Sequence, residues 1–297
     1  MSNEMKGVLL AIGATIGWSL SGVFIRFIPE IDAWTFNAYR GASMSVALLV
    51  WMLLRYRGET ISHFRQATLV PLVATAGFFG IGSSLYILAM QKASVAAVSC
   101  VAATSPLFAA LLAWVWLGEK TRLVVFLAIL VALGGVGVVA FGEKDASITG
   151  LEGSLIAILV ALCFAGQSVT LRRYHNVEMA PSLIVGGFGI FVVVALTQGL
   201  APITLNEMLI LAAMGTVQLA LPLVLYMRGA RYVPAVQMVL ISLADAFLNP
   251  FWVWLVHREV PSGSVFLGGA LILGAIAFVT VRKAAPPPRQ DVPVISD

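Results

Sequence analysis

Apolar stretches of about 20 residues follow one another along almost the whole chain, separated by short clusters of charged residues, prolines and glycines. As an α-helix, a stretch of about 20 residues crosses the roughly 30 Å of hydrocarbon in a bilayer. Charged residues make up 11% of the chain, against about 25% in soluble domains, and the mean hydropathy is +0.97. The runs are continuous rather than alternating, which excludes a transmembrane β-barrel. The sequence therefore predicts an all-α membrane protein.

Charges, prolines and polar clusters divide the chain into ten predicted transmembrane helices. They cover residues 7–27, 34–54, 68–90, 94–116, 122–141, 152–172, 181–200, 207–228, 234–256 and 264–282. The connections are short, so we expect no domain outside the membrane. The polar start of the chain is short and the run after it is long enough to span, so we expect no cleaved signal peptide. The Pro-rich tail, residues 284–297, is predicted to be disordered.

The distribution of basic residues predicts the orientation. An even number of spans places both termini on one side, and most of the 18 Lys and Arg residues fall in the connections on that side. Because cytoplasmic loops carry the excess of Lys and Arg, we expect both termini in the cytoplasm and the protein in the inner membrane. Cys100 and Cys163 both lie within apolar runs, so no disulfide is expected.

A weak internal repeat runs through the chain. Residues 85–120 align without a gap over residues 225–260, and residues 7–26 align over residues 153–172. The alignment pairs Tyr86 with Tyr226, Trp114 with Trp254, Glu119 with Glu259, Trp18 with Phe164 and Ser21 with Gln167. Each half, residues 1–146 and 147–283, holds an odd number of spans, so the two halves must insert in opposite orientations. Inverted repeats with a site at their interface are a recurring plan of secondary transporters.

Several motifs resemble the EamA family of the drug/metabolite transporter superfamily. They are SPLFAALLAWVWLGEK, the preceding ASVAAVS, and GWSLSGVFIR in the first span. The resemblance covers the whole chain as two tandem repeats, and it implies ten helices around a central cavity and transport of small organic metabolites by alternating access. Two positions depart from the family pattern: Asp245-Ala246 stand where the second-half motif reads Glu-Pro, and Arg258 replaces the Gly of the LGE motif.

One carboxylate, Asp245, falls near the middle of the ninth predicted span. At helical spacing it shares a face with Asn249. A charge at the bilayer centre costs at least ~2.5 kcal/mol, so this face should line a cavity or meet a polar partner. Asp245 is therefore the principal candidate for binding substrate or a coupling proton, with Asn249 beside it. The alternative is a structural carboxylate that joins neighbouring helices, paired with Arg40.

Other polar and aromatic residues in the spans are further candidate substrate contacts. They are Trp18, Ser21, Tyr86, Ser105, Phe164, Gln167 and Gln218. For each aromatic residue, ordinary packing is the competing interpretation. Arg40 lies about two turns below the outer end of its span, where it could reach Glu30, Asp32 or a ligand carboxylate. Arg40 and Asp245 are candidate coupling or gating residues, and so are Pro106 and Pro250, which can bend their spans.

The predicted function is secondary transport of a small organic metabolite or drug-like solute, with a proton as the candidate coupling ion. A lipid-carrier or lipid flippase of the same superfamily is the alternative within transport, and a membrane sensor is a more distant one. The three histidines fall in predicted loops and no HExxH or CxxC motif occurs, so an enzyme is disfavoured and no metal or cofactor is expected. The expected partners are the small-molecule substrate and membrane lipids, not nucleic acid, and the expected state is a monomer or weak homodimer.

Overall fold

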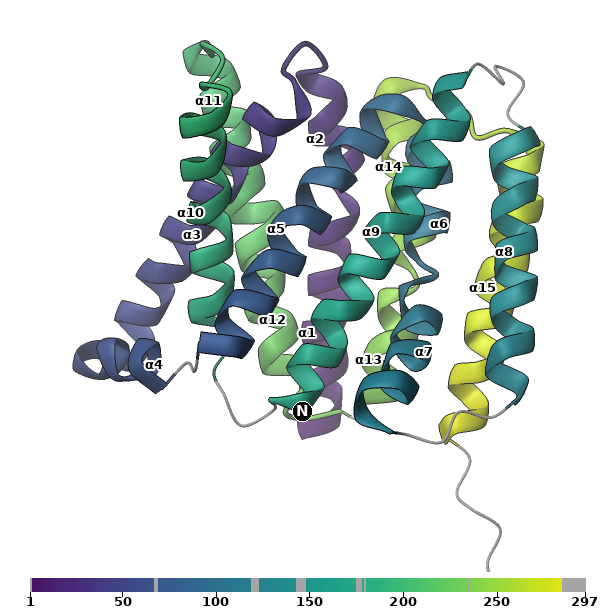
Figure 1. Ribbon diagram of the computed structural model, residues 1–297, viewed down its shortest axis with the longest axis horizontal. Helices are drawn as coiled ribbons and strands as arrows, with labels where there is room; N and C mark the ends of the chain where they lie inside the picture. Colours follow the sequence, from purple (N-terminus) through teal and green to yellow (C-terminus); the bar gives the residue numbers. More distant parts are fainter. Residues whose placement is uncertain are drawn as a thin grey trace, which may run out of the picture.

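The protein is a bundle of helices that run up and down between two ends (Figure 1). The computed structural model describes residues 2–66, 69–118, 123–142, 148–174, 178, 180–233 and 235–284, and these contain helices and no strand. The helices are α1 (Asn3–Ser19), α2 (Ser21–Phe27), α3 (Ala33–Tyr56), α4 (Thr60–Gln66), α5 (Leu69–Lys92), α6 (Val95–Ala102), α7 (Ser105–Leu117), α8 (Leu123–Gly142), α9 (Ile148–Arg173), α10 (Ala180–Thr197), α11 (Leu205–Ala213), α12 (Leu221–Gly229), α13 (Ala235–Ser242), α14 (Asp245–His257) and α15 (Gly263–Ala284). The predicted tail beyond residue 284 lies outside the described residues.

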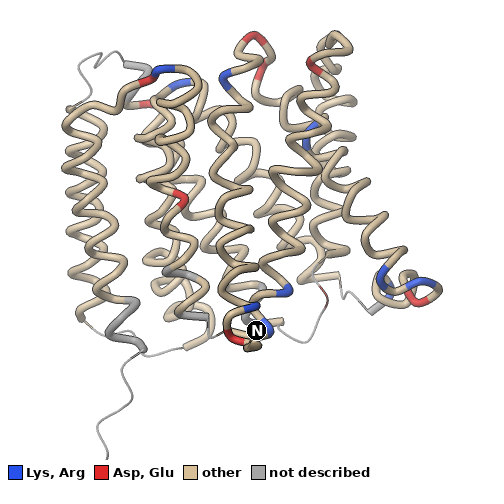
Figure 2. The backbone as a smooth tube through the Cα atoms, turned by 180° about the vertical axis from the view of Figure 1, so that it is seen from behind, with Lys and Arg blue, Asp and Glu red and all other residues tan. Residues whose placement is uncertain are grey.

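Seven helical segments of the described chain are long and apolar enough to cross a membrane. They are Asn3–Phe27, Leu69–Lys92, Val95–Leu117, Leu123–Gly142, Leu151–Thr170, Ala180–Thr197 and Leu205–Gly229. Large apolar side chains such as Leu54, Phe141 and Leu196 are exposed on the flanks of the bundle, whereas charged residues gather mainly at its two ends (Figure 2). An apolar belt between two charged ends is the surface of a multi-pass membrane protein.

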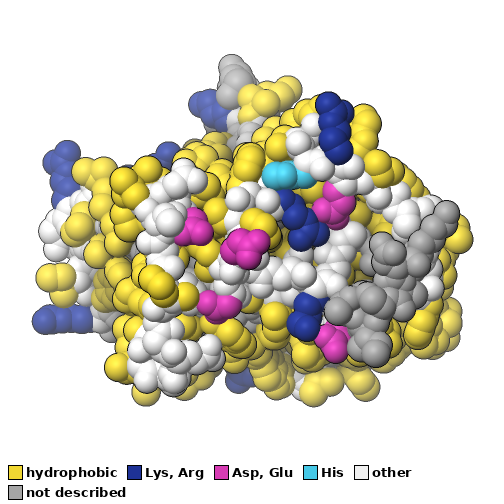
Figure 3. All heavy atoms as spheres, turned by 90° about the horizontal axis from the view of Figure 1, so that it is seen from above, with side chains coloured by type: hydrophobic (Ala, Val, Ile, Leu, Met, Phe, Trp, Pro, Cys, Tyr) yellow, Lys and Arg dark blue, Asp and Glu magenta, His cyan; other side chains and the backbone are white. Residues whose placement is uncertain are grey.

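The two ends of the bundle differ in charge. The start of α1 and the end of α15 lie together at the lower end in Figure 1. The basic residues described at that end are Lys6, Arg55, Arg57, Arg65, Arg173, Arg228 and Arg231, against Glu4, Glu59 and Glu178. Seen from above, acidic side chains lie near the middle of the upper end, with basic side chains among them (Figure 3). The described residues there are Glu30, Asp32, Glu152, Glu207 and Glu259, with Arg26, Lys92 and Arg258.

Several crossing segments are interrupted near their middle, whereas the sequence predicted only that Pro106 and Pro250 can bend their spans. One segment breaks at Leu20, between α1 and α2, and a π-helical turn, Met214–Ala220, separates α11 from α12. Two further breaks precede Ser105 and Asp245, which begin α7 and α14. At the first of these, Pro106 lacks the N–H that would continue α6 into α7.

The breaks before α7 and α14 stand at matching places in the sequence repeat. Ser105 and Asp245 are separated by the same offset that pairs Tyr86 with Tyr226. Both helices also end on a residue in the left-handed conformation, Gly118 at φ 67° and Arg258 at φ 60°. Gly118, the glycine of the LGE motif, and Arg258, at the matching position of the second half, therefore end their helices in the same way.

Glycines bring neighbouring helices close together. A Cβ added at Gly41 of α3 would lie 3.1 Å from the carbonyl oxygen of Gly187 in α10. A Cβ added at Gly135 of α8 would lie 2.7 Å from the carbonyl oxygen of Gly268 in α15. Small residues at such crossings allow close van der Waals packing, which is a main source of helix association in a bilayer.

Candidate functional site

The break between α1 and α2 leaves two backbone groups inside the bundle without a helical hydrogen bond to each other. In a continuous helix the N–H of Gly22 would donate to the carbonyl oxygen of Trp18. Here the Gly22 N–H donates to Oδ1 of Asn249 at 3.0 Å, and the Trp18 carbonyl accepts from Nε2 of Gln218 at 3.2 Å. Water is absent from the bilayer core, so these two amides replace the lost helical bond.

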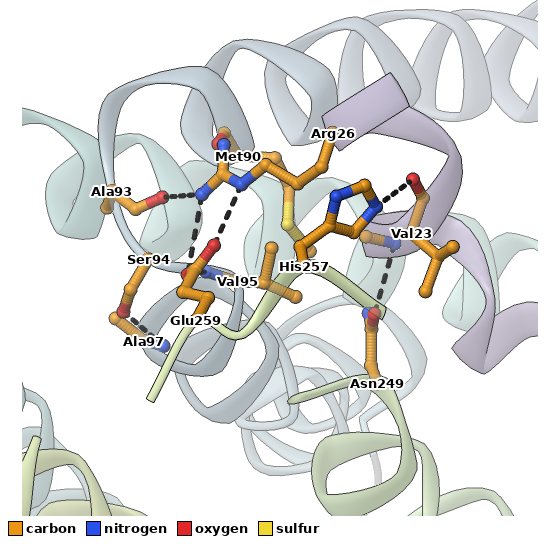
Figure 4. Close-up of polar contacts among 11 residues, drawn as sticks. Val23, Arg26, Met90, Ala93, Ser94, Val95, Ala97, Asn249, His257 and Glu259 are labelled. Carbon is orange, nitrogen blue, oxygen red and sulfur yellow. Dashed lines mark hydrogen bonds and ion pairs between the residues drawn. The ribbon is translucent and has the colours of Figure 1, made fainter. Parts of the chain in front are cut away.

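Asn249 is the hub of a buried hydrogen-bond network. Its side chain is 0% exposed. Its Nδ2 lies 2.9 Å from Oγ of Ser21, 3.2 Å from the hydroxyl of Tyr86 and 3.1 Å from Oγ of Ser99. These partners lie on α2, α5 and α6, and Figure 4 shows Asn249 reaching from α14 towards α2. Its hydrogen-bonding groups are thus occupied by protein partners, which favours a role in positioning helices.

Asp245 stands one turn away and is differently placed. It is the first residue of α14, so its carboxylate lies at a helix N-terminus, where the helix dipole favours negative charge. Its Oδ1 is buried and accepts no hydrogen bond from the described part of the chain. The hydroxyl of Tyr86 lies within electrostatic range of both Asp245 and Arg40. Asp245 therefore offers an acceptor without a partner at the centre of the bundle.

Arg40 has local partners and does not pair with Asp245. Its Nε and Nη2 donate to Oδ1 of Asn37 at 3.2 and 2.7 Å, and Nη2 also donates to Ser83. The described ion pairs are Arg26–Glu259 and Lys92–Glu152. The structural alternative in which Asp245 pairs with Arg40 is therefore not what this fold contains.

The expectation that Arg40 reaches Glu30 or Asp32 is also wrong. Oδ1 of Asp32 accepts the N–H groups of Trp34 and Thr35 and caps α3. Arg40 is 3% exposed and is held against α5 within the bundle. Its neighbours satisfy the guanidinium, so it does not extend along the span to the charged end.

Aromatic rings surround the α1–α2 break. Trp18 packs on Tyr226 with ring centroids 5.2 Å apart, and the indole N–H of Trp252 donates to Oγ of Ser19 at 3.0 Å. The hydroxyl of Tyr86 shares a hydrogen bond of 2.9 Å with Ser21. These contacts and those described above place six of the predicted site residues around this break: Trp18, Ser21, Tyr86, Gln218, Asn249 and Asp245.

Other predicted site residues lie elsewhere. Phe164 and Gln167 are on α9, where a Cβ added at Gly82 of α5 would lie 3.4 Å from the Phe164 ring. No hydrogen bond or ring contact of the described residues joins Phe164 or Gln167 to Asp245. Ser105 and Pro106 begin α7 at the matching break, whereas Pro250 lies inside α14, which continues through it.

Several polar residues of the network were not predicted from the sequence. Ser99 binds Asn249, Asn37 and Ser83 bind Arg40, and Gln237 has a buried Oε1 that accepts no hydrogen bond from the described chain. The sequence signal that could have identified these residues is a single polar side chain within an apolar run. Within the described residues, no group of three or more His, Cys, Asp or Glu could hold a metal ion.

A second network lies at the upper end (Figure 4). Nε of Arg26 donates to Oε2 of Glu259 at 2.9 Å, and its Nη1 donates to the carbonyl of Met90 at 2.9 Å. Oε1 of Glu259 accepts the N–H of Val95 at 3.1 Å. His257 adds a bond of 3.1 Å to the carbonyl of Val23. The network joins α2, the turn between α5 and α6, and the connection after α14.

Comparison with known proteins identifies the family. The EamA-like transporter family matches residues 5–141 and again residues 151–281. The chain belongs to this family. The pseudopaline exporter CntI of Pseudomonas aeruginosa (strain UCBPP-PA14) is 28% identical over 290 residues, which are 94% of this chain and 97% of that protein. The uncharacterized transporter YdfC of Bacillus subtilis (strain 168) is 23% identical over 246 residues, 80% of this chain and 78% of that protein.

A solved crystal structure shares the fold. It matches with a TM-score of 0.67 at 20% identity and covers 94% of this chain and 99% of its own. The family resemblance read from the sequence motifs is thus confirmed. Membership of a transporter family and the similarity to an exporter support a membrane transporter of a small metabolite.

The network around Asn249 predicts the effect of its removal. Asn249→Ala leaves the Gly22 N–H without an acceptor inside the bundle, which should cost about 1–3 kcal/mol of stability. The apparent unfolding temperature of the purified protein in detergent should fall. Ser21→Ala is the matched control, because Asn249 then keeps Tyr86, Ser99 and Gly22 as partners, so the fall should be smaller. Equal unfolding temperatures for Asn249→Ala and wild type would contradict the assigned role.

Proposed function

We propose that the protein is a secondary transporter of the bacterial inner membrane that moves a small organic solute by alternating access. Ten membrane-crossing segments would form two inverted five-helix repeats, residues 1–146 and 147–283. The two separate family matches support this division. Besides the seven long apolar segments, α3, α13–α14 and α15 also run between the ends, and the 24 residues of α3 span about 36 Å as a helix.

The observation that carries the proposal is the unpaired Oδ1 of Asp245 at an interrupted helix. Hydrogen bonds join residues of both proposed halves at the neighbouring α1–α2 break: Trp18, Ser21 and Tyr86 from the first, Gln218 and Asn249 from the second. In transporters built from inverted repeats, broken helices form the substrate and ion sites near the middle of the membrane. A proton or a donor group of the solute would be the missing partner of Asp245. Trp18 and Tyr226 would supply the apolar wall.

The direction and the class of solute follow from different observations. The similarity to an exporter supports export of a metabolite from the cytoplasm. A centre that contains a carboxylate, two amides and a phenol suits a polar solute better than an acyl chain. This favours a small metabolite over the lipid-carrier and flippase alternative, and the family favours transport over an enzyme or a sensor.

The charge difference between the ends predicts the orientation. The basic lower end, where α1 begins and α15 ends, would face the cytoplasm. In intact cells, cysteines introduced as Asn3→Cys and Gln290→Cys should not react with an impermeant maleimide, whereas Ser147→Cys should react. All three should react after permeabilisation, which controls for access. Labelling of position 3 or 290 in intact cells would overturn this orientation.

The role of Asp245 predicts the behaviour of Asp245→Asn. This variant keeps the size of the side chain and its hydrogen bonding, but it removes the charge and the titration. Transport of a metabolite mixture by proteoliposomes, followed by mass spectrometry, should fall at least tenfold or lose its pH dependence between about pH 5.5 and pH 8. Unfolding temperature should change little. Glu207→Gln, at the upper end, is the control that should transport normally. Normal transport by Asp245→Asn over this pH range would sink the proposal.

Alternating access predicts that a cross-link between the halves blocks transport. In a chain without Cys100 and Cys163, cysteines at Arg26 and Glu259 would replace an ion pair that joins the proposed halves. A short thiol cross-linker should then abolish transport. The matched control pairs Arg26→Cys with Ala93→Cys, since Nη2 of Arg26 lies 3.3 Å from the Ala93 carbonyl within the first half. Both pairs lose the same arginine, and each is compared before and after cross-linking, so the additional loss of Glu259 in the first pair does not enter the comparison. Equal transport after both cross-links would reject the rocking of one half against the other.

A further inference from the structure

A basic cleft opens at the lower end of the bundle. Its volume is about 620 Å³, and it lies among α1, α3, α12 and the turn before α13. Four cationic side chains line it, Lys6, Arg55, Arg228 and Arg231, with Glu178 as the acid among the lining residues. Figure 2 shows Lys and Arg close to the N-terminus at this end. The cleft therefore has a strong excess of positive charge.

The cations of this cleft have no acidic partner within the described chain. The ion pairs that the described residues form are Arg26–Glu259 and Lys92–Glu152, and both lie at the upper end. Oε2 of Glu178 accepts the hydroxyl of Tyr56 at 2.9 Å. The positive-inside rule explains why basic residues occur at one end, but it does not require them to line one concave surface. Charges of one sign in a cleft concentrate the field and attract ligands of the opposite sign.

Aromatic residues complete the wall of the cleft. Trp51 lines it, and its indole N–H is a buried donor that makes no hydrogen bond with the described residues. The rings of Tyr56 and Trp51 lie edge to face with their centroids 6.0 Å apart. The guanidinium carbon of Arg55 lies 5.9 Å from the centroid of the Tyr56 ring. The cleft thus combines guanidinium groups and aromatic side chains, which suits an anionic group attached to a carbon skeleton.

We infer that this cleft is a binding site for a carboxylate- or phosphate-bearing ligand, separate from the Asp245 centre. Leu10 and Met227 are among its lining residues, and Tyr226, which precedes Met227 in α12, packs on Trp18. The cleft is therefore formed partly by the same two helices, α1 and α12, that carry the Trp18–Tyr226 pair beside the α1–α2 break. If the proposed transport function holds, the ligand is an acidic solute captured before transport. The headgroup of an anionic lipid offers the same chemistry.

Citrate is the probe for the test. Its binding is measured by calorimetry at constant ionic strength on the full chain in phosphatidylcholine nanodiscs. Wild type should bind saturably, and Arg55→Gln or Arg228→Gln should each weaken binding about tenfold, as expected for loss of one charged hydrogen bond. Trp51→Phe should weaken it less. Arg65→Gln is the matched control, since Arg65 is an exposed arginine of α4 at the same end and does not line the cleft. Unchanged unfolding temperatures without citrate establish that each variant is folded.

A second arm identifies the source of the ligand. If phosphatidylglycerol in the nanodiscs abolishes citrate binding by wild type, the site is an anion site filled by lipid headgroups. If citrate binds equally with phosphatidylglycerol present, the site is an anion site for soluble ligands. Absence of saturable citrate binding in phosphatidylcholine, or equal weakening by Arg65→Gln and Arg55→Gln, would overturn the inference. The measurement involves no transport, so its failure and the failure of the Asp245 proposal are distinguishable.

Discussion

The architecture depends on one constraint, which is that backbone N–H and C=O groups freed in the middle of a membrane must find partners within the protein. The α1–α2 break frees the Gly22 N–H and the Trp18 carbonyl, and amides from two other segments bind them. Each interruption therefore requires side chains from elsewhere in the chain. In this way the breaks that create a polar centre also fix how distant segments pack around it.

Two polar residues of this centre, one helical turn apart, differ in their hydrogen-bond partners. Asn249 is fully buried and its amide is engaged by four partners, whereas Oδ1 of Asp245 accepts nothing from the described chain. A buried amide with all its partners fixes helices in place, and an acceptor left without a donor is costly unless a ligand or a proton supplies one. The fold thus separates a residue that holds helices together from a carboxylate that, in the proposed function, would bind the solute or a proton.

Much of this could be predicted from the sequence because the signals were local. Apolar runs gave the helices, and the position of Asp245 in its run gave its depth. The repeat paired Ser105 with Asp245, and both begin half-helices at matching breaks. Arg258 was noted as a departure from a glycine, and the two residues share the left-handed conformation. These results needed only spacing along the chain.

The remainder required knowledge of which helices touch. Arg40 was placed by its distance to the end of its span, but Asn37 and Ser83 bind it inside the bundle. Phe164 and Gln167 were included by analogy with Trp18 and Ser21, yet α9 packs on α5 and no described contact joins them to Asp245. The basic cleft could not be foreseen, because its cations come from α1, α3, α12 and a turn that are far apart in sequence. Helix contacts of this kind are set by small residues and crossing geometry, which a single sequence does not reveal.

Under the proposed alternating access, the network of Arg26 and Glu259 would make the two faces of the membrane unequal in binding. Opening the upper end would require breaking the ion pair and releasing the Met90 carbonyl and the Val95 N–H to water. A solute that arrives from above would bind only the fraction of molecules in which this has happened, and its apparent dissociation constant would be the intrinsic value divided by that fraction. The lower end carries no matching ion pair among the described residues, so the fraction open below would be the larger one. The same site would then have a lower apparent affinity from above than from below, even with no energy source attached.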